Sequence, residues 1–295
     1  MTAPPPFLSY LDDGGGDLHL LDAVHRPLSP SPSRFRDTKD FVDMPIVVVD
    51  VASSPEAVKG RLRRAKGASE VDAILRECFG APGSDLETCA PDDWTSDLRN
   101  EEILGQLRAD ARDFVAYVHS CWGLLCKRVA ADARIGQDRH TIIETPHKLF
   151  VPGSRFREQY YWDSYFVMHG LLVSRMPSSA FQIVENLLHC VERFGYVPNG
   201  TRAYYLGRSQ PPLLSEMVSD LWSFSRRRES LAGRATDLLR RALPLLITEH
   251  AFLTGAERAV TLRWVHALPT PTHLHCPPPP PADSPPLSLS LSLID

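Results

Sequence analysis

The stretch Pro152-Gly-Ser-Arg-Phe-Arg-Glu-Gln-Tyr-Tyr-Trp-Asp-Ser-Tyr-Phe166 decides how the rest of the chain is interpreted, and we call it the signature segment. It combines Arg155, Arg157, Glu158 and Asp163 with closely spaced aromatic rings. Such rings can stack on the C–H face of a sugar, while Arg and carboxylate groups hydrogen-bond to hydroxyls. A partly buried aromatic turn whose charges pair with each other explains the same composition. Composition alone therefore leaves both interpretations open.

The signature segment resembles the first signature of the trehalases, glycoside hydrolases that split α,α-trehalose into two glucose molecules. The resemblance is nearly continuous from Pro152 to Phe166. The main departure is Ser154, where the family usually has a second glycine. If this position requires a positive φ, we expect Ser154 to carry some strain there, since glycine adopts that conformation freely.

The resemblance implies an all-α fold, the (α/α)6 toroid of the trehalases, with two rings of six helices and the sugar site at one end. Helical hairpins need roughly 30–40 residues each once their loops are counted. Residues 97–252 offer about five helices by their apolar spacing, so the toroid is expected to be incomplete in this chain. We therefore interpret the chain as the N-terminal half of a trehalase.

A second informative segment runs from Tyr196 to Pro212, and we call it the second loop. Long polar and aromatic loops on a helical scaffold often bind ligands, although a plain surface loop has the same composition. This loop is similar to the trehalase segment that follows the first signature. We expect the two segments to meet at one end of the helical domain. Together the two resemblances imply that trehalose is contacted by Arg155, Trp162, Asp163, Asn199, Arg208, Ser209 and Gln210.

No catalytic residue is assigned in this chain. An inverting glycosidase needs one carboxylic acid to protonate the leaving oxygen and one carboxylate to activate water. In the trehalases these two residues lie in the C-terminal half, beyond the matched region. Asp163 and Glu158 are tempting substitutes, but the family's residue matching Asp163 helps to hold the substrate. We expect no cofactor and no metal.

Three hypotheses follow. The chain is a truncated or mis-spliced α,α-trehalase, or a non-catalytic half-domain that binds sugar or pairs with itself or a full-length trehalase, or an unrelated helical interaction protein. The apolar faces that an incomplete ring would expose favour self-association.

The predicted domain organisation has three parts. Residues 1–33 are rich in Pro, Gly and Ser and are expected to be disordered, as is the Pro-rich tail at 263–295. Residues 34–262 form the helical domain, although the resemblance fades after Leu253. The segment from Arg34 to Met44 resembles the family's N-terminal segment, with the pattern Asp-x-Lys-x-Phe-Val-Asp.

Apolar periodicity predicts the helices of this domain. One long helix with a single apolar stripe is expected at 97–135, where ordinary packing explains the stripe. Residues 80–97 are expected to be a loop, and 47–49 a strand or an extended arm. Gly195 should end a helix and Pro244 should kink one. The remaining expected helices are one or two within 55–78, and one each at 162–175, 181–194, 212–228 and 235–252.

Charge and cysteine content exclude several classes of protein. The 295 residues carry a formal net charge of −4 and no basic stripe, which argues against nucleic-acid binding. No apolar run is long enough to span a membrane, and residues 1–10 lack the features of a signal peptide, so the chain as written is expected to be cytoplasmic. The six cysteines show no paired spacing and indicate free or buried thiols. His273, His275 and Cys276 hint at a metal site but lie in the Pro-rich tail.

Overall fold

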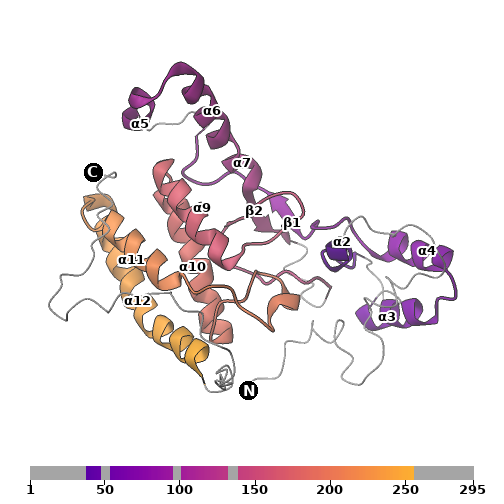
Figure 1. Ribbon diagram of the computed structural model, residues 1–295. Coiled ribbons are helices and arrows are strands. Elements are labelled where there is room, and N and C mark those ends of the chain that lie inside the picture. The colour runs from indigo at the N-terminus through magenta and orange to yellow at the C-terminus, as the bar shows by residue number, and fades with distance from the viewer. Residues whose placement is uncertain (1–37, 48–53, 96–100, 132–138, 256–295) are drawn as a thin grey trace, which may run out of the picture. The chain divides into compact units, whose positions relative to one another are not determined.

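The structure is a computed structural model that describes residues 38–47, 54–95, 101–131 and 139–255 (Figure 1). None of the helices described there is long and apolar enough to cross a membrane. Helices alternate with a few short strands. In chain order the elements are α2 (Thr38–Val42), α3 (Pro55–Arg64), α4 (Ala68–Cys78), β1 (Leu86–Thr88), α5 (Glu101–Gln106), α6 (Ala109–Ser120), α7 (Trp122–Leu125), β2 (Cys126–Val129), β3 (Leu149–Phe150), α9 (Tyr161–Val173), α10 (Pro177–Phe194), the 3₁₀ turn η3 (Ala203–Tyr205), α11 (Leu214–Ser225) and α12 (Glu229–Thr254).

The main hydrophobic core lies among α9, α10, α11 and α12, with α10 in contact with each of the other three (Figure 1). Residues 174–176 join α9 to α10, and 226–228 join α11 to α12. Such short connections make consecutive helices into hairpins. The prediction of a helical domain is confirmed for this part of the chain. The side chains most deeply buried in this core include Tyr161, Met168, Leu171, Phe181, Leu187, Leu188 and Leu221.

The termini of α10 follow their sequence signals. Pro177 occupies the first turn, where its missing N–H costs nothing and its fixed φ suits a helix. Gly195 ends the helix with φ 83°, a left-handed conformation that glycine adopts without a Cβ clash. Both features agree with the predicted helix end at Gly195.

The turn at the start of the signature segment has two consecutive residues with positive φ. Gly153 has φ 106° and Ser154 has φ 55°. The Phe156 N–H donates to the Gly153 carbonyl at 3.1 Å and closes the turn. The expected strain at Ser154 is therefore present, because a residue with a Cβ occupies the left-handed region.

The single helix predicted at 97–135 is wrong. Within the described residues of this range, the helical part is divided into α5, α6 and α7, and β2 begins at Cys126. Phe114 and Val118 belong to the apolar stripe that was expected to pack, yet they are 66% and 45% exposed. The periodicity was misleading because β2 forms backbone hydrogen bonds with strands on both sides. Apolar spacing within one segment contains no information about such partners from elsewhere in the chain.

A small antiparallel sheet with strand order β1-β2-β3 replaces that end of the helix. Strand β1 lies in a region predicted to be a loop, and Leu86 stands opposite Val129. Cys126 stands opposite Phe150 in the other pair. The sheet is short, yet it fixes where the chain enters the signature segment, since β3 ends immediately before it.

A second core lies among α2, α3 and α4. Helices α3 and α4 correspond to the one or two helices predicted within residues 55–78. Ile46 forms a bridge with Phe79, and 48–53 lie outside the described residues.

Helix α12 begins at Glu229, earlier than predicted, and is continuous through Pro244. The predicted disordered segments at 1–33 and 263–295 also lie outside the described residues, so these domain limits stay predictions.

Candidate functional site

Backbone pairing joins the signature segment to the second loop. Tyr160 and Gly200 form a bridge, and the Thr201 N–H donates to the Gln159 carbonyl at 2.9 Å. The Tyr161 N–H donates to the Asn199 carbonyl at 3.2 Å. The two segments that the sequence predicted to meet therefore lie side by side.

Gln210 caps the helix that carries Trp162 and Asp163. Its Oε1 accepts a hydrogen bond from the Trp162 N–H at 3.0 Å, one of the first-turn amides that have no partner within α9. The Tyr161 hydroxyl accepts in turn from the Leu214 N–H at 3.0 Å. These contacts hold the start of α9 against the end of the second loop. The Trp162 side chain remains 45% exposed at this position.

Arg208 and Ser209 are held by the fold of the second loop itself. The Asn199 N–H donates to the Arg208 carbonyl at 2.9 Å, and the Ser209 hydroxyl donates to the Val197 carbonyl at 2.6 Å. The exposed Arg208 guanidinium lies over the Tyr205 ring, 5.3 Å from its centroid. The loop thus presents an arginine beside an aromatic face.

Asp163 and Arg155 complete the predicted set. Asp163 lies in the first turn of α9, and its partial burial raises the pKa of its carboxyl group. Arg155 is exposed in the preceding turn, with its guanidinium 5.1 Å from the Phe156 ring centroid. Phe156 packs edge-on against Tyr160, with ring centroids 5.6 Å apart. Arg155 is thus connected to the paired segments through two rings.

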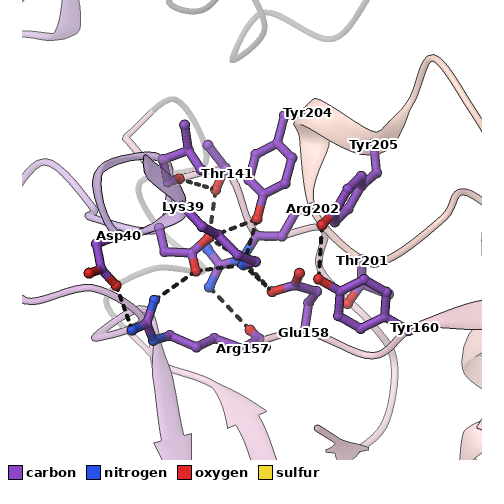
Figure 2. Close-up of polar contacts among 12 residues, drawn as sticks. Lys39, Asp40, Thr141, Arg157, Glu158, Tyr160, Thr201, Arg202, Tyr204 and Tyr205 are labelled. Carbon is purple, nitrogen blue, oxygen red and sulfur yellow. Dashed lines mark hydrogen bonds and ion pairs between the residues drawn. The ribbon is translucent and has the colours of Figure 1, made fainter. Parts of the chain in front are cut away.

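Beneath these residues lies a buried charge cluster that sequence reasoning did not find (Figure 2). At its centre Arg202, whose side chain is fully buried, forms a two-pronged pair with Asp85. Arg202 also donates to the Thr141 hydroxyl and to the Arg157 carbonyl, each at 3.2 Å. Burial by itself would lower the pKa of Arg202, but Asp85 and Asp43 outweigh it and raise that pKa. The members of the cluster are Lys39, Asp43, Asp85, Arg157, Glu158, Arg202 and Tyr204.

Glu158 belongs to this cluster. Its side chain is fully buried, and its Oε2 accepts from the Lys39 ammonium at 2.9 Å. The Arg202 Nε lies 3.8 Å from the same oxygen. Glu158 is therefore engaged inside the fold through its Oε2.

Arg157 also pairs with the N-terminal segment. Its guanidinium donates to Asp40 at 2.8 Å and to Asp43 at 3.0 Å. The alternative interpretation, in which the charges of the signature segment pair with each other, is wrong for Arg157 and Glu158, because α2 and the residue after it supply their partners. The pattern Asp-x-Lys-x-Phe-Val-Asp was the one sequence signal for this arrangement, since it contains Lys39 and Asp43.

No group of three or more His, Cys, Asp or Glu side chains that could hold a metal occurs among the described residues. His273, His275 and Cys276 lie outside them.

The sequence profile of the family named Trehalase matches residues 33–284. The chain belongs to the trehalase family. The matched region includes residues that the structure does not describe.

Relatives from plants and animals show the same similarity. The chain is 42% identical over 218 residues to a probable trehalase of Oryza sativa subsp. japonica, which covers 73% of this chain and 37% of the relative. It is 39% identical over 200 residues to a trehalase of Arabidopsis thaliana (65% and 29%) and 37% identical over 191 residues to a trehalase of Homo sapiens (62% and 32%). The chain thus spans about a third of the length of the curated relatives it matches.

Among solved structures, neutral trehalase Nth1 from Saccharomyces cerevisiae is 39% identical where it aligns. The alignment covers 34% of this chain and 18% of that chain, with a TM-score of 0.32. This overlap is too small to bear on the arrangement of the helices.

Proposed function

We propose that this chain forms the substrate-holding part of an α,α-trehalase, which hydrolyses trehalose to two glucose molecules with inversion. Membership of the family supports the reaction. The observation that carries the proposal is the hydrogen bond from the Trp162 N–H to the Gln210 side chain, because it joins the two segments that bear the predicted contacts.

The exposed side chains of the site have roles that suit ligand contact, whereas Asn199 is buried. The exposed indole of Trp162 offers a stacking face for a pyranose ring. Arg155 and Arg208 donate hydrogen bonds to hydroxyl oxygens, and Asp163 accepts from hydroxyl groups. Asn199, Ser209 and Gln210 line the same loop and complete the predicted contact set.

The general acid and base of the inverting reaction are not assigned to this chain. Inversion needs two carboxyl groups roughly 6.5–9.5 Å apart, with room for a water molecule between one of them and the sugar. Glu158 is engaged within the buried charge cluster, and the family resemblance implies that Asp163 holds the substrate. The chain alone should therefore bind trehalose and hydrolyse it negligibly.

Titration calorimetry of the purified chain with trehalose tests the binding. Trp162→Ala should weaken binding at least about tenfold, the effect of losing a stacking surface worth more than about 1.4 kcal/mol. Phe114→Ala is the matched control, because Phe114 is an exposed ring on α6, outside the predicted site. Absence of trehalose binding, or an equal loss in both variants, would overturn the proposal.

Glucose release from trehalose tests the second statement. Turnover on the scale of ordinary enzymes, about 1–1000 per second, would mean that a carboxylate of this chain acts as the acid or the base. Asp163→Asn would then be the first variant to assay.

A non-catalytic interaction half-domain is the second candidate function. It is supported by apolar side chains that the described part of the chain leaves at its surface, among them Phe114 (66% exposed) and Ile247 (72%). Exposed apolar side chains that come together in a patch favour association. We expect the chain to associate with itself or with a full-length trehalase, and the double variant Phe114→Glu, Ile247→Glu to associate less in sedimentation. A wild-type monomer that melts in one sharp transition would contradict this candidate.

A further inference from the structure

Two cysteines that are not among the candidate site residues face each other across the small sheet. The Sγ atoms of Cys89 and Cys126 are 3.1 Å apart, and the Cys89 N–H donates to the Cys126 carbonyl at 3.1 Å. The register of β1 and β2 places Thr88 opposite Lys127, so the next position along brings Cys89 opposite Cys126. Both are free thiols in the structure.

This placement fits the geometry that a disulfide requires. Directly opposed residues of a hydrogen-bonded antiparallel pair have Cα atoms about 5.5 Å apart. Disulfides join residues whose Cα atoms are about 4.4–6.8 Å apart. The pair can therefore be bridged without a rearrangement of the backbone.

The two thiols differ in their surroundings. Cys126 is fully buried in the main core, whereas Cys89 is partly exposed at the end of β1. The hydrogen bond with Cys126 lowers the pKa of Cys89 to about 7; burial and Asp92 oppose this, and Lys148 and Arg128 favour it. Lys148 also donates to the Ala90 carbonyl at 3.0 Å, beside the cysteine. Cys89 is thus the accessible thiol that can ionise, and Cys126 is the buried thiol behind it.

We propose that Cys89 and Cys126 form a reversible redox site that a peroxide oxidises to a disulfide. The Cys89 thiolate attacks one oxygen of hydrogen peroxide; an S–O bond forms, the O–O bond breaks, and the departing hydroxide takes up a proton to become water. The Cys126 sulfur then attacks the Cys89 sulfenic acid. The S–S bond forms, the S–O bond breaks, and hydroxide leaves with the Cys126 proton as a second water. Two thiols are oxidised and one peroxide is reduced.

The disulfide would act on the segment that supports α10. Asp93, close to Cys89, accepts from the Ser178 and Ser179 N–H groups at 2.7 and 3.2 Å and so caps the first turn of α10. A bond at Cys89 would tie this capping segment to β2 and close the intervening chain into a loop. Oxidation should therefore raise the midpoint of thermal unfolding by roughly 5–10 °C.

The experiment treats the purified, reduced chain with graded hydrogen peroxide, blocks remaining thiols with iodoacetamide, and maps peptides by mass spectrometry. The expected product is one cross-linked peptide pair, Cys89 with Cys126, about 2 Da lighter than the sum of its reduced parts and restored by dithiothreitol. Cys126→Ser should leave a Cys89 sulfenic acid that dimedone traps. Cys89→Ser should form no such cross-link and should show no thermal shift.

Cys121→Ser is the matched control, because Cys121 is a partly exposed thiol whose hydrogen bond goes to the Tyr117 carbonyl. This variant should form the cross-link as the unaltered chain does. Oxidation of Cys89 to a sulfinic acid without a cross-link, pairing of Cys89 with another cysteine, or preferential oxidation of Cys121 would each overturn the proposal.

Discussion

Arg157 and Glu158 face inward and pair with α2 and the residue that follows it, whereas Trp162, a few residues further along, and Arg208, in the second loop, stand at the surface. The two regions have the same kinds of side chain, but the buried one takes Lys39, Asp43 and Asp85 from outside the signature segment and the second loop. In the first region, each charged side chain forms an ion pair with another residue of this chain. The second leaves a ring and a guanidinium exposed. The position of its partner thus decides whether a charged residue of the signature segment stabilises the fold or remains available to bind a ligand.

Gln159 separates the two regions. It is buried, and its amide donates to the Ile183 carbonyl at 3.1 Å on α10 and to Ser164 at 3.2 Å. Its Oε1 accepts from Asn186 at 3.2 Å. These contacts hold the signature segment against α10. Residues before Gln159 contact the N-terminal segment, and residues after it begin α9.

The largest effect should come from Arg202→Ala. Removing this guanidinium leaves Asp85, Asp43 and Glu158 in a buried site without their central cation, which costs about 3–5 kcal/mol of unfolding free energy. Urea denaturation measures the change. Arg208→Ala, at the surface, is the matched control and should change stability by less than about 0.5 kcal/mol. Equal stability of the two variants would refute the contrast between the regions.

A smaller and more selective effect is expected from two carboxylates of the signature segment. Glu158→Gln removes the buried partner of Lys39 and should lower the unfolding free energy by about 1–3 kcal/mol. Asp163→Asn should leave stability nearly unchanged and weaken trehalose binding. Urea denaturation measures the stability of both variants, and calorimetry measures their trehalose binding. If Asp163→Asn lowered stability and Glu158→Gln weakened binding, the two residues would belong to the opposite regions.

The smallest effect concerns Glu249 on α12, a carboxylate that is buried but not part of the charge cluster. Its Oε1 has no hydrogen-bond partner in the described part of the chain, and burial raises its pKa. Because the folded-state pKa lies above the unfolded value, Glu249 costs stability once it ionises, and the cost disappears as the pH falls through the raised pKa towards the ordinary value of 4.5.

Glu249→Gln should therefore stabilise the chain by on the order of 1 kcal/mol at pH 8 and by nothing near pH 4. Thermal unfolding at both pH values measures the difference. A gain that is the same at both would show that the carboxylate's charge is not its source. His250→Gln, at the exposed neighbouring position, serves as the control.

Features that depend on neighbours in the chain were predictable from the sequence. The helix end at Gly195 follows from the left-handed conformation that glycine adopts locally, whereas the positive φ of Ser154 was an expectation from the family resemblance. The helices of the main core follow from apolar spacing, because a helix brings residues three and four apart onto one face. The meeting of the signature segment with the second loop followed from the family resemblance and not from spacing.

Features that depend on distant partners were decided by the tertiary structure. Strand β2 exists because β1 and β3 complete its backbone hydrogen bonds, and periodicity within residues 97–135 contains no record of those strands. In the sequence, Arg202 is one of several polar residues of the second loop. Its partner Asp85 lies 117 positions earlier. The sequence by itself determined the family, the helical core and the two segments that meet. The fold alone decided which charges are buried, because burying a charge is tolerable only where an opposite charge from elsewhere in the chain arrives beside it.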